Sequence, residues 1–224
     1  MLELGSGDGA FVRRLVNAGL PRQNIVCTEY SPHGCEKIAA LGIRCLAEDI
    51  RAVEPARFPE PFDTICMFQV LEHLDKLDEL FRALHRLMRP RGSVFLAVPN
   101  FRRIEFNEAH GALLDMPPNH IGRWNRRCFE KLAAAHGFQM QLHATEPFSF
   151  LPAWKQLAYY RFLRVAQRSG GVANRIHSIN NRRLRQMLEI GAIALTASTS
   201  LHAALRMTPD MGNSQWVHFR KSDL

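Results

Sequence analysis

Residues 1–16 are MLELGSGDGAFVRRLV, and this stretch decides the fold. Residues 2–4 are too few for a helix and too apolar for a loop, so we interpret them as the end of a buried strand. A glycine-rich turn over 5–9 follows, and apolar residues then recur at helical spacing over 11–16. Glycine has no Cβ, so the backbone can bend sharply and a ligand can come close to it. The pattern predicts a ligand site at the carboxyl end of a strand in an open α/β sheet.

Two ligand classes fit this turn. Gly5, Gly7 and Ala10 satisfy the dinucleotide pattern GxGxxG/A, and Glu29 follows at about the distance of a ribose-binding acid. A nicotinamide-dependent oxidoreductase is therefore one hypothesis. Glu3 argues against it, because a carboxylate just before the first glycine would repel a pyrophosphate. The same carboxylate would attract a ligand that carries an amino group and a sulfonium.

The length and composition indicate how large a core the chain can bury and in which compartment it is expected. With 224 residues, 46% of them hydrophobic, the chain can bury one domain core plus an elaboration. The five cysteines are odd in number and have no CxxC spacing, which indicates reduced thiols and a cytoplasmic protein without a zinc site. No signal peptide is recognisable, because the chain begins within the first strand.

Short apolar segments alternate with helical patterns along the first hundred residues. The segments 24–28, 43–46, 62–68 and 93–98 read as strands, and 77–88 reads as an amphipathic helix. This alternation predicts an α/β fold, a Rossmann-like doubly wound sheet that is mostly parallel. A helix over 125–136 and a strand over 138–145 follow a long connection over 99–124. The alternating segment 214–220 is expected to be an antiparallel last strand.

Five motifs occur in a characteristic order: Glu3–Gly9, Glu29, Asp49, the LEH segment 71–73, and Pro99-Asn100. Together they resemble the motifs of class I S-adenosylmethionine-dependent methyltransferases of the ubiquinone-biosynthesis type. The resemblance implies a methyltransferase domain over 1–146 and 207–224, and a helical insertion over 147–206. That family carries a helix and the first half of this strand upstream, so the chain is expected to be N-terminally truncated.

The resemblance also implies the cofactor, S-adenosyl-L-methionine, and its contacts. Glu29 would accept both ribose hydroxyls, and Tyr30 would pack on the adenine. Asp49 would accept from the adenine amine, with Glu48 as the competing choice, and Ile50 would flank the ring. The complete set of expected cofactor contacts is Glu3, Gly5, Ser6, Gly7, Gly9, Glu29, Tyr30, Asp49, Ile50, Phe68 and Gln69.

Methyl transfer to a hydroxyl requires a base as well as alignment of the acceptor. His73 follows the fourth strand, and His120 lies in the segment 117–124, which resembles a substrate-side loop. Both are candidate catalytic bases, although His73 could instead cap the helix that follows it. We expect methylation of an oxygen on a small-molecule or lipid-linked acceptor.

A metal-dependent reading rests on Glu72, His73 and His120, which match part of the E-x-x-E-H pattern of methyltransferases that act on small-RNA 3′ ends. The first acid of that pattern is Gln69 here. Because hard cations prefer carboxylate oxygens, the loss of this acid weakens such a site. We therefore predict no metal.

The formal charge of +8 is concentrated in the second half of the chain. Residues 155–185 contain eight lysines or arginines and no acid. This block could meet an anionic membrane surface or be the solvated face of a substrate cap, whereas nucleic acid is the less favoured partner. A non-catalytic binding module that uses this surface is the remaining alternative. Residues 190–205 carry no charge and are expected to form a buried packing helix. The oligomeric state is not indicated.

Overall fold

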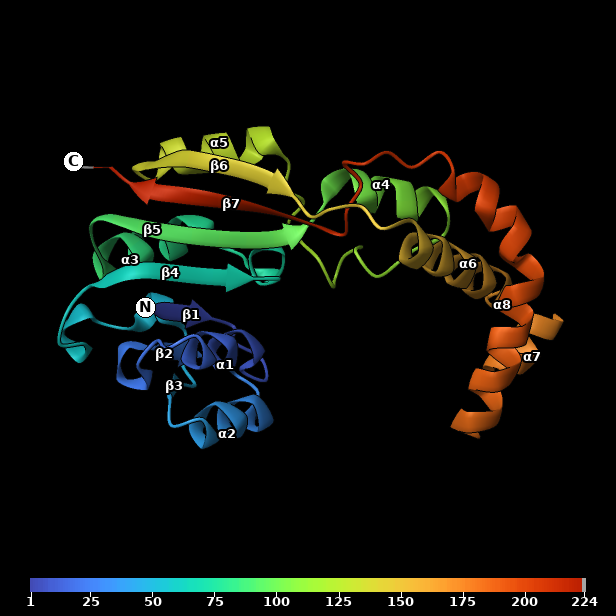
Figure 1. Cartoon of the computed structure of the whole chain (residues 1–224), viewed down its shortest axis with the longest axis horizontal. Coiled ribbons are helices and arrows are strands. Elements are labelled where there is room, and N and C mark those ends of the chain that lie inside the picture. Colours follow the sequence, from blue (N-terminus) through green and yellow to red (C-terminus); the bar gives the residue numbers. More distant parts are fainter. Residues whose placement is uncertain (223–224) are drawn as a thin grey trace. The chain divides into compact units, whose positions relative to one another are not determined.

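The computed structural model describes residues 1–222, apart from the side chains of 195, 196 and 199. The chain divides into two compact units (Figure 1). The sheet unit contains Met1–Pro99, Ile121–Ala144 and the C-terminal segment from Ser214. The helical unit contains Asn100–His120 and Thr145–Asn213. The segment 100–120 is thus part of the helical unit, and the domain boundaries expected from the sequence stay a prediction.

Within the described residues, seven strands form one sheet in the order β3-β2-β1-β4-β5-β7-β6. Strand β1 pairs in parallel with both β2 and β4, and β7 pairs antiparallel with β5. The predicted mostly parallel sheet with an antiparallel last strand is therefore confirmed. The strands are β1 (Leu2–Leu4), β2 (Val26–Thr28), β3 (Arg44–Leu46), β4 (Phe62–Phe68), β5 (Met88–Pro99), β6 (Phe138–Thr145) and β7 (Ser214–Lys221).

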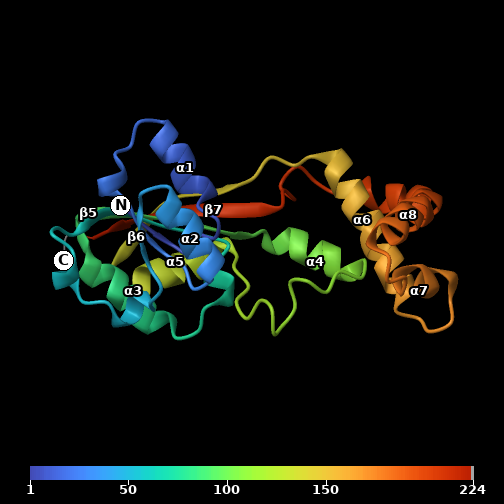
Figure 2. The ribbon, with the colours of Figure 1, turned by 90° about the horizontal axis from the view of Figure 1, so that it is seen from below.

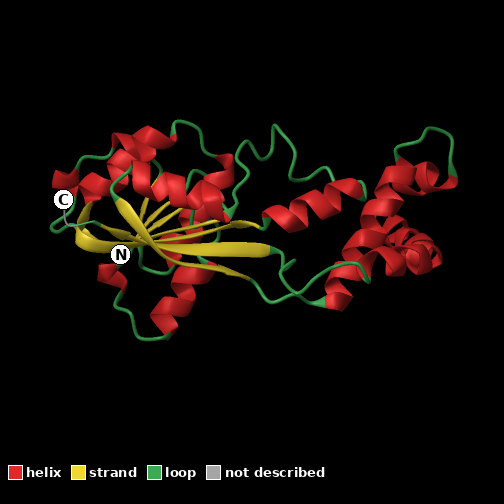
Figure 3. Cartoon of the chain, turned by 90° about the horizontal axis from the view of Figure 1, so that it is seen from above, coloured by secondary structure: helices red, strands yellow, loops and turns green. Residues whose placement is uncertain are grey.

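Helices cover both faces of the sheet (Figures 2 and 3). On one face, α1 (Ala10–Asn17) and α2 (Pro32–Ala40) bury Val12 and Ile38 in a small core. On the other face, α3 (Leu77–Leu87) and α5 (Arg126–Ala135) bury Phe81 and Phe129 in the main core. Short 3-10 helices occupy Arg22–Asn24, Ile50–Ala52, Pro55–Arg57 and Leu71–His73.

The connection after β5 contains a helix that the sequence analysis did not predict, α4 (Phe101–Ala109). Asn100 caps it, because its side-chain oxygen accepts from the Arg102 amide at 3.1 Å. The Asn100 side-chain nitrogen donates to the carbonyls of Asp210 and Gly212 at 2.7 and 3.0 Å. The start of α4 is therefore held by residues more than a hundred positions away in the sequence.

In the helical unit, α6 (Phe150–Ala166), α7 (Val172–His177) and α8 (Arg182–Ala204) pack together. The expectation that 190–205 forms a buried helix is wrong for one side of α8. Ser200 and Ala204 are buried, but Ile190 and Leu205 are 68% and 67% exposed. Burial is one-sided because α8 packs only through this side on its neighbours in the unit. No helix among the described residues is long and apolar enough to cross a membrane.

Candidate functional site

The glycine turn links β1 to α1 in the sheet unit. Gly5, Gly7 and Gly9 all have left-handed backbones, with φ of 65°, 55° and 75°. A Cβ on Gly5 would lie 2.6 Å from Val70 Cγ2, so no side chain fits there. A Cβ on Gly7 would have no atom within 4 Å, so the backbone is open to a ligand at this point. The turn is therefore tightly packed at Gly5, and its backbone is accessible to a ligand at Gly7.

Glu29 holds the turn against the tip of β2. Its Oε2 accepts from the Gly7 amide at 2.8 Å, and its Oε1 accepts from the Ser31 amide at 2.8 Å. Gly34 lies so close that a Cβ there would be 2.7 Å from Glu29 Cγ. Each carboxylate oxygen keeps a second lone pair that can accept from a hydroxyl. The role of Glu29 toward a ribose stays a prediction.

Glu3 lies in β1, opposite Cys27 of β2 and Cys66 of β4. The side chain is 4% exposed, and its Oε2 has no hydrogen-bond partner among the described residues. Burial raises the pKa of this carboxyl to about 7, although the Ser6 hydroxyl partly offsets the effect. A buried carboxylate with one oxygen lacking a hydrogen bond is stabilised by a proton or by a cationic ligand. Glu3 therefore fits a site for a positively charged amino group.

This burial predicts a pH dependence of the ligand-free protein. Because the pKa of Glu3 is raised from 4.5 to about 7 on folding, its carboxyl favours the folded state most below pH 4.5. We expect stability to fall by about 3 kcal/mol as the pH rises from 4.5 through 7, at 1.36 kcal/mol per pKa unit. The variant Glu3→Gln should lack this contribution. Urea unfolding at several pH values measures the free energy of unfolding of both proteins. The same dependence of this free energy on pH in the variant and the unchanged chain would contradict the prediction.

The residues expected around the adenine lie at the ends of β2 and β3. Tyr30 is 65% exposed, and Ile50 is buried. The Asp49 carboxylate accepts from Arg51 Nε and from a terminal guanidinium nitrogen at 2.9 and 2.6 Å, and this ion pair lowers the pKa of Asp49. The competing Glu48 pairs with Arg57 at 2.6 Å. The role of Asp49 toward the adenine amine stays a prediction. In that role its carboxylate would accept from both the amine and Arg51.

Phe68 is the last residue of β4, and Gln69 follows it directly. The Phe68 ring packs edge-on against Phe11 of α1, with ring centroids 4.7 Å apart. Gln69 has a left-handed backbone with φ of 58°, and its amide donates to the Ala97 carbonyl at 2.7 Å. A non-glycine residue held in this region is strained, which is common where a chain is shaped for function.

The two candidate bases belong to different units. His73 is an exposed residue at the end of the 3-10 helix Leu71–His73 in the sheet unit. Its neighbour Glu72 is buried, and the Glu72 carbonyl accepts from the amides of Ile121 and Gly122, both at 2.9 Å. The metal hypothesis joins Glu72 and His73 to His120, which the helical unit contains. The prediction that these residues bind no metal stays a prediction.

His120 has an acidic neighbour that the sequence analysis did not single out. Its Nδ1 lies 3.2 Å from Asp115 Oδ1, and both side chains are largely buried. An acid at this distance can form an ion pair with the imidazole when the ring is protonated. The spacing of five residues does not by itself predict this pair, because the path of the loop decides whether the two side chains meet.

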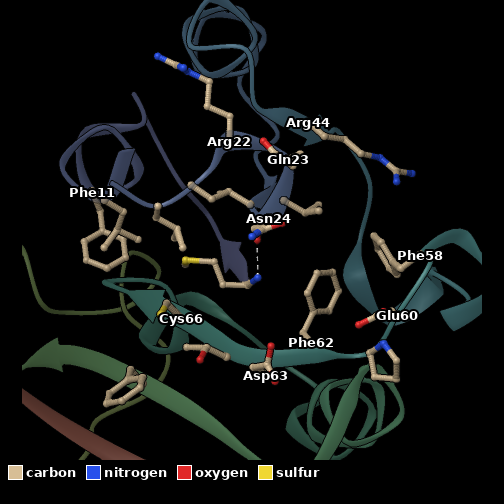
Figure 4. Close-up of a pocket in the computed structure, with 18 of the residues that line it drawn as sticks. Phe11, Arg22, Gln23, Asn24, Arg44, Phe58, Glu60, Phe62, Asp63 and Cys66 are labelled. Carbon is tan, nitrogen blue, oxygen red and sulfur yellow. Dashed lines mark hydrogen bonds between the residues drawn. The ribbon is translucent and has the colours of Figure 1, made fainter. Parts of the chain in front are cut away.

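A cavity of about 1240 Å³ lies on the α1 face of the sheet unit (Figure 4). Its walls include Phe11 of α1 and Phe62 and Cys66 of β4, and its lining is mostly apolar. Among the residues that line it, the N-terminal amine of Met1 donates to the Asn24 carbonyl at 2.6 Å. The lining residues do not include residues 5–9 of the glycine turn. This cavity is therefore separate from the glycine turn.

The order of the strands, the glycine turn after β1 and the acid after β2 define a Rossmann-like methyltransferase fold. A family model described as methyltransferase domain matches residues 1–143. The chain belongs to this methyltransferase domain family. The predicted class of enzyme, an S-adenosylmethionine-dependent methyltransferase, is thereby confirmed, and the oxidoreductase hypothesis is replaced. No curated protein matches the chain in sequence.

Solved structures share the fold at low sequence identity. A putative sarcosine dimethylglycine methyltransferase from Galdieria sulphuraria is 17% identical with a TM-score of 0.54, covering 99% of this chain and 78% of that chain. A SAM-dependent methyltransferase from Archaeoglobus fulgidus is 13% identical with a TM-score of 0.58, covering 98% and 85%. Phosphoethanolamine N-methyltransferase 2 of Haemonchus contortus is 17% identical with a TM-score of 0.56, covering 99% and 48%.

Proposed function

We propose that the sheet unit binds S-adenosylmethionine over Gly5–Gly9 and that the chain methylates an oxygen of a small-molecule or lipid-linked acceptor. The observation that carries the cofactor site is the buried Glu3 carboxylate, whose Oε2 has no partner among the described residues. It lies in the strand that leads into a turn with an open backbone at Gly7. A cationic amino-acid group satisfies such a carboxylate, whereas a pyrophosphate does not.

Different residues of the sheet unit would contact different parts of the cofactor. The bound cofactor would supply a methyl group already activated on a sulfonium. Glu3 would neutralise its amino group, and Glu29 would accept from the ribose hydroxyls while it holds the turn through the Gly7 amide. Tyr30, which is exposed, would cover the adenine. The Haemonchus contortus structure carries S-adenosylhomocysteine, which supports the choice of ligand.

The preference for an oxygen acceptor rests on the histidines. A hydroxyl must lose its proton as the methyl group arrives, whereas a neutral amine attacks without prior loss of a proton. His120, which lies beside Asp115, and the exposed His73 are the groups that we assign to this task. Similar structures include the StiE O-MT as well as coclaurine N-methyltransferase, so these relatives do not select the acceptor atom.

Two measurements test the proposal. Calorimetry of the full chain with S-adenosylhomocysteine should give a 1:1 complex, and NAD should not compete for it. Mass spectrometry with methyl-labelled cofactor should then find label on the hydroxyl compounds of a panel in which each hydroxyl has a matched amine. Label on the amines alone would overturn the oxygen assignment. Failure to bind the cofactor product would overturn the site itself.

A further inference from the structure

We propose that the exposed side of α8 docks on an anionic lipid surface. The apolar face of α8 is defined here by Leu184, Met187, Ile190, Leu201 and, directly after the helix, Leu205. This inference concerns an interaction surface of the helical unit, and it does not depend on the acceptor or on the cofactor site proposed above.

The residues of the apolar face lie on one side of the helix, in one group near its start and a second group at its end. At about 100° per residue, positions 184, 187 and 190 and positions 201 and 205 fall within about a third of the helix circumference. Met187 and Ile190 are 65% and 68% exposed near the start of α8, and Leu205 is 67% exposed at its end. The other side is the packed one, where Ser200 and Ala204 are buried.

Such a face is unusual for a helix in water. Isolated exposed apolar side chains are ordinary, but several on one side of a single helix mark an interaction site. The two groups of the apolar face together span about 32 Å from Leu184 to Leu205, at 1.5 Å per residue. This span fits an extended surface better than a small pocket.

The charges around the face are almost all positive. Residues 150–206 contain nine lysines or arginines and a single acid, Glu189. That acid accepts from His177 at 2.8 Å and is largely buried. Arg182 and Arg183 are exposed at the start of α8, and Arg206 follows its end. The apolar face is thus bordered by cations whose charge no exposed acid of this segment offsets.

This charge pattern decides between two occupants. A second copy of the chain on the same face would bring arginines against arginines, which costs free energy. A layer of anionic headgroups would neutralise them while the apolar side chains enter the acyl region. A helix with one apolar side and cationic borders lies in the plane of such an interface. The anionic lipid surface is therefore the occupant that the residues favour.

Vesicle sedimentation with the full chain tests the proposal. We expect binding to vesicles of phosphatidylcholine with phosphatidylglycerol to be at least about tenfold tighter than to phosphatidylcholine alone, and to weaken as salt is added. The double variant Met187→Gln with Ile190→Gln should bind the anionic vesicles about tenfold more weakly. The double variant Arg182→Gln with Arg183→Gln should lose most of the preference for anionic lipid.

A matched control changes two exposed apolar residues of the same unit outside α8. Leu113 and Leu114 are 53% and 62% exposed, and replacing both by glutamine should leave vesicle binding within about twofold. Circular dichroism would confirm that each variant is folded. Equal binding to neutral and anionic vesicles, or no binding to either, would overturn the proposal. A dimer in light scattering that the Met187 and Ile190 substitutions dissociate would overturn it in favour of a second copy.

Discussion

The variant Glu29→Ala is expected to bind S-adenosylhomocysteine about 100-fold more weakly than the unchanged chain, because it loses charge-assisted hydrogen bonds worth about 3 kcal/mol in total. The substitution removes the proposed acceptor for the ribose hydroxyls. It also frees the Gly7 and Ser31 amides, which Glu29 now holds at 2.8 Å each. The open turn would then no longer be preorganised. Calorimetry at fixed pH and salt measures the effect.

Two further variants make this result specific. Glu29→Gln keeps the shape of the side chain but not its charge, so it should fall between the two proteins in affinity. Glu36→Ala removes an exposed acid from α2, and it should change the affinity by less than about twofold. An unchanged affinity in a folded Glu29→Ala protein would remove Glu29 from the ribose role.

Gly212→Ala is expected to destabilise the helical unit by about 3 kcal/mol or more, as overpacking against backbone does. A Cβ at this position would lie 1.9 Å from the Glu146 carbonyl oxygen and 2.7 Å from its carbon. The Gly212 carbonyl accepts from Asn100 at 3.0 Å, so a shift of the loop would also loosen the cap of α4. Hydrogen exchange should rise throughout 100–120 and 145–213, and urea unfolding measures the loss of free energy.

A second glycine of the helical unit provides a control, because its replacement by alanine is expected to raise stability. Gly191 lies within α8, and a Cβ there would have no atom within 4 Å. Gly191→Ala should therefore stabilise the helix by up to about 1 kcal/mol, because alanine loses less backbone entropy than glycine. If Gly212→Ala unfolded at the same urea concentration as the unchanged chain, the tight approach to Glu146 would not be a constraint on the fold.

Local signals predicted much of the sheet unit. Ser31 caps α2, its Oγ accepting from the Gly34 amide at 3.3 Å, and Pro32 occupies the first position of the helix, and both preferences act within four residues of sequence. The pairing of Asp49 with Arg51 also lies within three residues, and the sequence analysis missed it. Asp115 beside His120 was missed for a different reason, because no local pattern predicts the path of a loop.

The sequence by itself determined the glycine turn, the alternation of strands and helices, and the methyltransferase family. These features depend on backbone freedom, side-chain spacing and caps, which act over a few residues. Only the tertiary structure decided that Asn100 starts α4 through Asp210 and Gly212, and that Glu3 is buried with an Oε2 that has no hydrogen-bond partner among the described residues. It also decided which side of α8 meets water. Burial and long-range hydrogen bonds depend on residues far apart in the chain, and no local pattern contains them.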